Sequence, residues 1–301
     1  MKKLLNTIAL FIWAQVVFAQ DFPYHYFVHN VPLVSNPSLA AARDKLNFSV
    51  ASYNLWAGGF KPLNDNVIAF SYDVKRKGKA KTSFDSDVGV GFVFANENIG
   101  PFTKNILQLI YAYHIPLTRD LQLSLGVSGM VANMSINVNS LNPLHGDDPR
   151  LVRGNNKTIS FDGGFGAALI NKQYEVSLSV LNLAPSDYRF EDPSIEDIVN
   201  FRKYFLSGTY HLELNPKIFI SPLITLRNVE KDNFGYDVSG AVRLSSFRFG
   251  VGYRSEKTLF LYTRIDFKSF EFTYTSENPM QSNHMVGNGH NFSLGWKISK
   301  L

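Results

Sequence analysis

The sequence predicts an all-β protein, a transmembrane outer-membrane antiparallel β-barrel of about 14 strands. Three observations lead to this fold class: an export signal at the start of the chain, an alternation of apolar and polar residues, and connections of alternating length. The alternation has a period of two and recurs from the first predicted strand to the end of the chain, whereas helical periodicity is nearly absent.

The first 19 residues have the order of a secretory signal peptide. Lys2 and Lys3 are followed by an apolar stretch from Leu4 to Phe18, and small residues end at Ala19. An uncleaved anchor is the alternative, but the apolar stretch is shorter than the about 20 residues that a spanning helix needs. We therefore expect residues 1–19 to be removed by cleavage after Ala19.

The mature chain divides into an N-terminal periplasmic or plug segment, residues 20–45, and a barrel, residues 46–301. It contains no cysteine, which excludes a disulfide framework and a lipid-bearing cysteine at the cleavage site. The net charge of +5 is mild and argues against a nucleic-acid partner. Backbone pairing and packing alone must stabilise this exported chain.

Each predicted strand has one apolar and one polar or small face. In the stretch LQLSLGVS, residues 121–128, leucine and valine alternate with glutamine, serine and glycine. Most segments are close to the about 9–11 residues that a tilted strand needs to cross a bilayer. The fourteen segments are 46–54, 66–74, 86–94, 106–114, 120–131, 157–169, 174–182, 204–213, 217–226, 236–244, 247–255, 259–266, 270–276 and 289–298.

The connections between these segments alternate in length from the fourth strand on. Short turns such as NKQ, NP and KS follow or precede longer stretches at 132–156, 183–203 and 277–288. Short turns in the periplasm and longer loops outside are typical of outer-membrane barrels, and an even strand number places both chain ends in the periplasm. A soluble exported β-sandwich or propeller is the alternative, because it uses the same alternation with the apolar face inward.

The strongest charge run is KRKGKAK, between the second and third strands. Strand parity predicts that it lies on the periplasmic side. It either docks an acidic periplasmic partner or is a solvated turn. Its candidate partner residues are Lys75, Arg76, Lys77, Lys79 and Lys81.

No catalytic constellation emerges from the sequence, so we expect no enzyme activity, no cofactor and no metal. His25 and His29 would share a face only on a helix, which the flanking prolines disfavour. Asp147 and Asp148 could bind calcium, but a plain solvated loop is the better explanation of this stretch. The glycine-rich stretch at 162–169 lacks the helix that a phosphate-binding loop requires.

The stretch YHYFVHNVPLVSNPSLAA, residues 24–41, precedes the first strand and fits no regular pattern. Pro32 and Pro37 cannot donate to a strand ladder. We predict that this segment folds back into the periplasmic mouth as a short plug, with Tyr24, Tyr26 and Phe27 packed against the inner wall.

Part of this stretch, VPLVSNPSLAA, resembles the N-terminal N-P-x-x-x-N-P-A-x-A-G signature of the PorP/SprF family, membrane proteins associated with type IX secretion in Bacteroidetes. The matching residues are Pro32, Asn36, Pro37 and Ala40, and the departures are Val31, Ser38 and Ala41.

Three further motifs follow in the family's order. YNLWAGG is similar to a family segment through Tyr53, Trp56 and Gly58, and the YAYHIPLTRDLQLSLG stretch follows the central pattern. The closing GHNFSLGWKI resembles the family's Gly-His-Glu-x-Ser-Leu-Gly ending, with Asn291 at the acidic position. The candidate residues of this closing strand are Gly289, His290, Phe292, Leu294, Gly295 and Trp296.

The resemblance implies an integral outer-membrane barrel, surrounded by outer-membrane lipid, that works with type IX secretion components. The implied partners are a secreted, adhesin-like surface protein with a type IX C-terminal sorting domain and a periplasmic peptidoglycan-binding protein. The barrel would anchor that surface protein or assist its export.

Two rival functions remain open. A wall of fourteen strands can enclose a path for hydrophobic or small nutrients, so an outer-membrane transport channel is the first rival. An outer-membrane lipid hydrolase is the second, and the lack of a serine, histidine and acid set at plausible strand ends speaks against it.

Overall fold

The structure is a computed structural model of the chain. It describes residues 27–56, 63–74, 88–137, 156–184, 188–189, 198–230, 233–280 and 287–299. Among these residues, no helix is long and apolar enough to cross a membrane.

Almost all regular structure in the described residues is strand. The strands are β1 (Asp44–Trp56), β2 (Leu63–Asp73), β3 (Val88–Ile99), β4 (Phe102–Pro116), β5 (Leu121–Ile136), β6 (Asn156–Asn171), β7 (Tyr174–Leu181), β8 (Lys203–Tyr210), β9 (Leu212–Asn215), β10 (Ile218–Glu230), β11 (Asn233–Leu244), β12 (Phe247–Arg254), β13 (Thr258–Phe267), β14 (Phe270–Pro279) and β15 (Asn288–Ser299).

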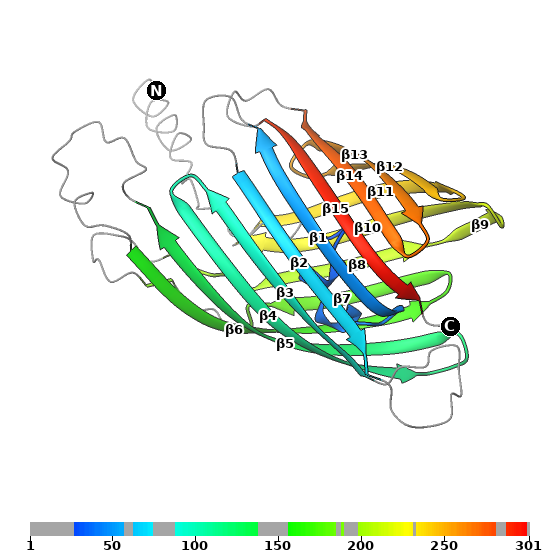
Figure 1. The fold of residues 1–301 in the computed structure, drawn as a ribbon, viewed down its shortest axis with the longest axis horizontal. Helices are drawn as coiled ribbons and strands as arrows, with labels where there is room; N and C mark the ends of the chain where they lie inside the picture. Colours follow the sequence, from blue (N-terminus) through cyan, green and yellow to red (C-terminus); the bar gives the residue numbers. More distant parts are fainter. Residues whose placement is uncertain are drawn as a thin grey trace, which may run out of the picture.

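These strands close into one antiparallel barrel (Figure 1). Neighbours along the chain pair in order, β1 pairs with β15, and β10 pairs with β8, β9 and β11, so the sheet closes on itself. β8 and β9 are two parts of one crossing that is interrupted at His211. The barrel therefore has fourteen crossings, and the predicted fold class is confirmed.

The barrel has two rims, which we call the terminal rim and the loop rim. β1 begins and β15 ends at the terminal rim, at the lower right of Figure 1. Turns there are short, as between β11 and β12, which Ser245 and Ser246 join. The basic run from Lys75 to Lys81 lies outside the described residues.

Two boundaries differ from the expected ones. β5 continues to Ile136, where the sequence suggested that a long loop begins at residue 132. The expected segments 86–94 and 106–114 left a longer connection, whereas β3 and β4 continue to a tight turn at the loop rim. This turn runs through Gly100, which has a φ of +56°. A residue without a Cβ adopts this left-handed conformation at little cost, which permits the abrupt reversal.

The barrel is apolar outside, and its inner face combines buried polar and charged residues with apolar ones. Large apolar side chains such as Leu109 and Phe161 are 62% and 71% exposed on the outer face. Lys104, Gln108 and His114, at alternate positions of β4, are at most 4% exposed and face the lumen. This distribution is the reverse of a soluble sandwich and suits a wall surrounded by lipid.

Near the loop rim, the outer face of β14, β15 and β1 to β5 changes from apolar to uncharged polar. Two adjacent rows of side chains, the amide rows, run across these strands in register. One row is Ser276, His290, Asn54, Asn64, Asn98, Thr103 and Ser135, and the other is Ser52, Asn66, Asn96, Asn105 and Asn133.

The amide rows are joined by side-chain hydrogen bonds within and between strands. Asn64 Nδ2 donates to Asn54 Oδ1 at 2.6 Å, and Asn66 Nδ2 donates to Asn64 Oδ1 at 2.7 Å. Asn96 Nδ2 likewise donates to Asn105 Oδ1 at 2.8 Å. Since the apolar belt ends at these rows, they indicate where this side of the barrel leaves the hydrocarbon region.

Residues 27–43, which we call the N-terminal segment, lie inside the barrel and appear in dark blue in Figure 1. Two short 3-10 helices, η1 (Pro32–Val34) and η2 (Pro37–Leu39), form its middle. Each begins with a proline, whose fixed φ suits the first turn and whose missing N–H would have no partner there. Both prolines thus stand outside the strand ladder.

Candidate functional site

The candidate site is the filled lumen, where the N-terminal segment meets the wall. Phe27, Val31 and Val34 are at most 2% exposed and belong to one apolar cluster with wall residues such as Val67 and Ile110. This cluster is the main apolar core of the described residues, and it lies inside a barrel whose outer face is also apolar. The segment therefore supplies the side chains that fill the lumen.

Polar wall residues of β4 and β5 hold the backbone of the segment. Ser124 Oγ donates a hydrogen bond to the Ser38 carbonyl oxygen at 2.5 Å. His114 Nε2 lies 3.0 Å from the carbonyl oxygen of Ala40, and Nδ1 of the same ring lies 2.6 Å from Ser124 Oγ. These contacts satisfy carbonyl groups that a buried segment without a strand partner would otherwise leave unpaired.

A second contact lies further round the wall, on β7. Ser179 Oγ donates to the Ser35 carbonyl oxygen at 2.6 Å, and Asn36 Nδ2 donates to the Leu178 carbonyl oxygen at 3.4 Å. Asn36 also caps η2, because its Oδ1 accepts from the Ser38 backbone N–H at 3.0 Å. Asn36 thus joins the local fold of the segment to its attachment on the wall.

Three strand glycines let the wall approach the segment closely. A Cβ placed on Gly89 would collide with the Ala40 carbonyl, one on Gly126 with the backbone between Pro37 and Ser38, and one on Gly166 with Asn36. The obstacles are mostly backbone atoms, which cannot swing away as a flexible side chain can. Glycine at these wall positions is therefore a condition for seating the segment.

The opposite side of the segment contacts β11 and β13 through His29. The His29 ring lies 5.0 Å from the Phe260 ring, and His29 Nε2 lies 3.8 Å from Asp237 Oδ2. The Phe260 ring lies over Gly252, where a Cβ would collide with it. Gly252 of β12 therefore makes room for an aromatic ring that contacts the segment.

Asp237 belongs to a buried network of charged residues on the lumen wall. Arg227 Nη2 donates to Asp237 Oδ1 at 3.0 Å, and Arg254 Nε lies 3.5 Å from Asp237 Oδ2. Arg254 Nη1 in turn donates to Glu277 Oε2 at 2.9 Å, and the hydroxyl of Tyr53 donates to the same oxygen at 3.2 Å. The network joins β10, β11, β12, β14 and β1 along the lumen wall.

The connection between β7 and β8 also contributes to the lumen. Tyr188 is 1% exposed and belongs to the same apolar cluster as Phe27, and its backbone forms an isolated bridge with Ile198. Lys104 Nζ lies 4.8 Å from the centre of the Tyr188 ring, over its face. Buried side chains in the lumen therefore come from the β7–β8 connection at the loop rim as well as from the N-terminal segment.

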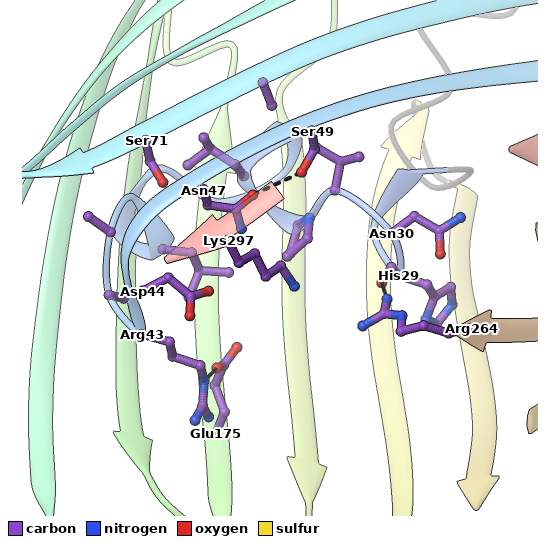
Figure 2. Close-up of a pocket in the computed structure, with 17 residues that line it drawn as sticks. His29, Asn30, Arg43, Asp44, Asn47, Ser49, Ser71, Glu175, Arg264 and Lys297 are labelled. Carbon is purple, nitrogen blue, oxygen red and sulfur yellow. Dashed lines mark hydrogen bonds and ion pairs between the residues drawn. The ribbon is translucent and has the colours of Figure 1, made fainter. Parts of the chain in front are cut away.

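A cavity of about 160 Å³ remains between the N-terminal segment and the wall. Figure 2 shows Arg264 beside His29, Lys297 below Asn47, and Arg43 facing Glu175. Arg43 Nε lies 2.9 Å from Glu175 Oε2, which attaches the end of the segment to β7. The lining is largely polar, and no group of three or more metal-ligating residues occurs in the described part of the chain.

The structure places only some of the predicted site residues. Phe27 is fully buried, and Pro32, Asn36, Pro37 and Ala40 all lie in the N-terminal segment. Tyr24 and Tyr26, and the five basic residues between Lys75 and Lys81, lie outside the described residues.

The closing strand β15 divides its residues between two faces. Phe292, Leu294 and Trp296 are exposed on the outer face, whereas Gly289 and Gly295 alternate with them and face the lumen. His290 belongs to the amide rows, and its Nδ1 lies 2.9 Å from the Tyr274 hydroxyl.

Sequence reasoning missed the buried charged network. Arg227, Asp237, Arg254 and Glu277 are distant in sequence and match no motif. The one available signal was a charged residue at the polar phase of an alternating strand, as at Arg254 in FRFGVGYR.

The sequence matches the family described as type IX secretion system membrane protein PorP/SprF over residues 16–296. A search of curated proteins gives no significant match. Among solved structures, the CymD monoaromatic hydrocarbon channel is similar at 10% identity and a TM-score of 0.51, over 88% of this chain and 91% of that one. The P. putida toluene transporter TodX is similar at 9% identity and a TM-score of 0.51, over 90% and 94% of the two chains. At these identities the two likenesses show the barrel fold alone.

Proposed function

The chain belongs to the PorP/SprF family of type IX secretion system membrane proteins, and from this premise we propose that it is a non-enzymatic accessory barrel of that pathway. In the outer membrane it anchors a large, adhesin-like surface protein or assists its export. Recognition of that protein runs through its C-terminal sorting domain. Type IX components and a peptidoglycan-binding protein contact the barrel from the periplasm.

The observation that carries this proposal is the family match across nearly the whole chain, and the filled lumen supports it. A barrel whose lumen holds the N-terminal segment, attached to β4, β5 and β7, resembles a docking platform more than an open pore. The outer face is apolar over most of its height, which suits permanent residence in lipid.

The test is a clean deletion of the gene, followed by quantitative comparison of the proteins on the cell surface. We expect particular large proteins with type IX sorting domains to be missing from the surface of the deletion strain and to be present again when the wild-type gene is restored. A surface proteome that is unchanged in the deletion strain would contradict the proposal.

A transport channel for hydrophobic or small nutrients is the second candidate, and its support is the fold shared with hydrocarbon channels. Substrate uptake by intact cells and conductance of the purified barrel in a planar bilayer distinguish the two candidates. A channel predicts that the deletion strain loses uptake while its surface proteome stays unchanged.

A further inference from the structure

Three arginines lie side by side on the inner wall near the terminal rim. Arg243 of β11 is directly opposite Arg248 of β12, and Arg248 is directly opposite Arg264 of β13. Each is at a lumen-facing position, because the residues before and after it, such as Phe247 and Phe249, are exposed to the outside. We call these three residues the arginine ladder.

Like charges directly opposite one another on neighbouring strands destabilise a sheet unless something compensates them. Arg264 has a compensating partner, since its Nη1 lies 3.2 Å from Glu271 Oε2, but Glu271 also binds Lys297 Nζ at 2.7 Å. One carboxylate therefore serves two cations at this end of the ladder.

Arg243 and Arg248 form no ion pair within the described residues. The Nε atoms of both are buried and donate no hydrogen bond. Arg243 instead lies over the Phe219 ring, with the guanidinium carbon 4.0 Å from the ring centre. The remaining acids nearby are Asp266, diagonally opposite Arg248, and Glu213, opposite Phe219. The ladder thus retains donors that face the lumen and have no acceptor.

We propose that the arginine ladder binds a carboxylate-rich peptide segment that enters the barrel through the terminal rim. Guanidinium groups bind carboxylates through paired, charge-assisted hydrogen bonds. Strands lie about 4.8 Å apart, so three of them span about 10 Å, which exceeds the size of a single carboxylate. An extended acidic segment can place several carboxylates along that distance, and the rings of Phe219 and Tyr262 offer apolar contact beside it.

The ladder also adjoins the cavity beside the N-terminal segment, which Arg264, Lys297 and Arg43 line. A bound acidic segment would therefore lie next to the residues that hold the segment in place. This inference deepens the proposed function, because it names the chemistry of a partner segment. Its test uses the purified barrel and does not depend on a secretion phenotype.

The experiment measures binding of a fluorescent hexaglutamate peptide to the full-length purified barrel in detergent, by fluorescence anisotropy at low and high salt. We expect binding that weakens with salt and that falls at least about tenfold in Arg248→Gln and in Arg243→Gln. Arg119→Gln is the matched control, because Arg119 is an exposed residue of the β4–β5 turn at the same rim. Heat-modifiable migration on gels verifies that each variant is folded, and Arg248→Lys should retain part of the affinity.

Three results overturn the proposal. Equal affinity of the wild type and Arg248→Gln excludes the ladder, above all if replacing the five basic residues between Lys75 and Lys81 by glutamine abolishes binding. Binding of tripolyphosphate without binding of hexaglutamate replaces the acidic peptide with a phosphate ligand. Equal binding of hexaglutamine removes the role of charge. If Arg248→Gln abolishes hexaglutamate binding but cells that carry this variant have a normal surface proteome, the ladder has no part in the secretion role.

Discussion

The Cα of Gly126 in β5 lies so close to the backbone of Ser38 in the N-terminal segment that no side chain fits between them. Two carbonyls that follow this contact along the segment are bound by the wall, that of Ser38 by Ser124 and that of Ala40 by His114. The segment therefore lies against the wall at backbone distance, and side-chain packing alone would not require such an approach.

The first prediction is that Gly126→Ala loosens the N-terminal segment. The added methyl group collides with backbone atoms, and overpacking of this kind costs about 1–3 kcal/mol. The chain has no cysteine, so a single Ser38→Cys substitution gives a clean probe at a fully buried position. We expect maleimide to label this cysteine about tenfold faster in the Gly126→Ala background, since 1.4 kcal/mol changes a population tenfold.

Gly129→Ala is the control for this prediction. Gly129 lies on the same strand, and a Cβ there meets no atom within 4 Å. Labelling of Ser38→Cys should be unchanged in this background. Equal labelling rates in the two alanine variants would show that the close approach at Gly126 does not hold the segment.

The second prediction concerns the buried network. Arg254 lies within 3.5 Å of both Asp237 and Glu277, and Arg254→Gln removes this shared cation. Removing one partner of a buried ion pair costs about 3–5 kcal/mol, which urea unfolding in lipid vesicles can measure. Lys172→Gln is the control, since its pair with Asp120 is 68% and 57% exposed and should contribute less than about 1 kcal/mol. A similar unfolding midpoint for both variants would contradict the network's role.

The strands of the barrel wall could be predicted from the sequence, because an alternation with a period of two is a local pattern. All fourteen expected segments coincide with crossings, and the interruption at His211 falls within the expected segment 204–213. The resemblance to PorP/SprF proteins is likewise confirmed by the family match.

The contents of the lumen could be predicted much less well. The contacts of Ser38 with Ser124 and of His29 with Phe260 join positions far apart in the chain, and only barrel closure and tilt bring them together. The arginine ladder depends on the registers of β11, β12 and β13, and a shift of one residue would turn Arg248 to the outside. Alternation alone does not fix those registers.

The third prediction is that the amide rows mark the boundary of the hydrocarbon region on the side of the loop rim. Asn66 and Phe70 are both on the outer face of β2, four residues apart, which corresponds to about 13 Å along the strand. An environment-sensitive dye on Phe70→Cys should be strongly quenched by nitroxides on lipid chains. The same dye on Asn66→Cys should be quenched mainly by a water-soluble quencher, and equal profiles would place the boundary elsewhere.

The fourth prediction is the orientation of the barrel. Both chain ends are expected in the periplasm, so the terminal rim should face inward and the loop rim outward. Lys257, in the β12–β13 turn at the loop rim, and Gln173, in the β6–β7 turn at the terminal rim, are both exposed. A membrane-impermeant maleimide should label Lys257→Cys in intact cells and Gln173→Cys only after the outer membrane is permeabilised. The reverse labelling pattern would show that the barrel has the opposite orientation in the membrane.

The fifth prediction follows from the two sources of buried material in the lumen. The N-terminal segment contributes Phe27 and Val34 to the same apolar cluster that receives Tyr188 from the β7–β8 connection. If both together seal the lumen, deleting residues 27–43 should raise single-channel conductance in a planar bilayer, and adding Tyr188→Ala to the deletion should raise it further. Tyr188→Ala alone should change conductance little, because the N-terminal segment still lies across the lumen. A wild-type barrel that conducts as well as the deletion variant would show that the segment leaves a continuous water path, and would favour the transport channel over the docking platform.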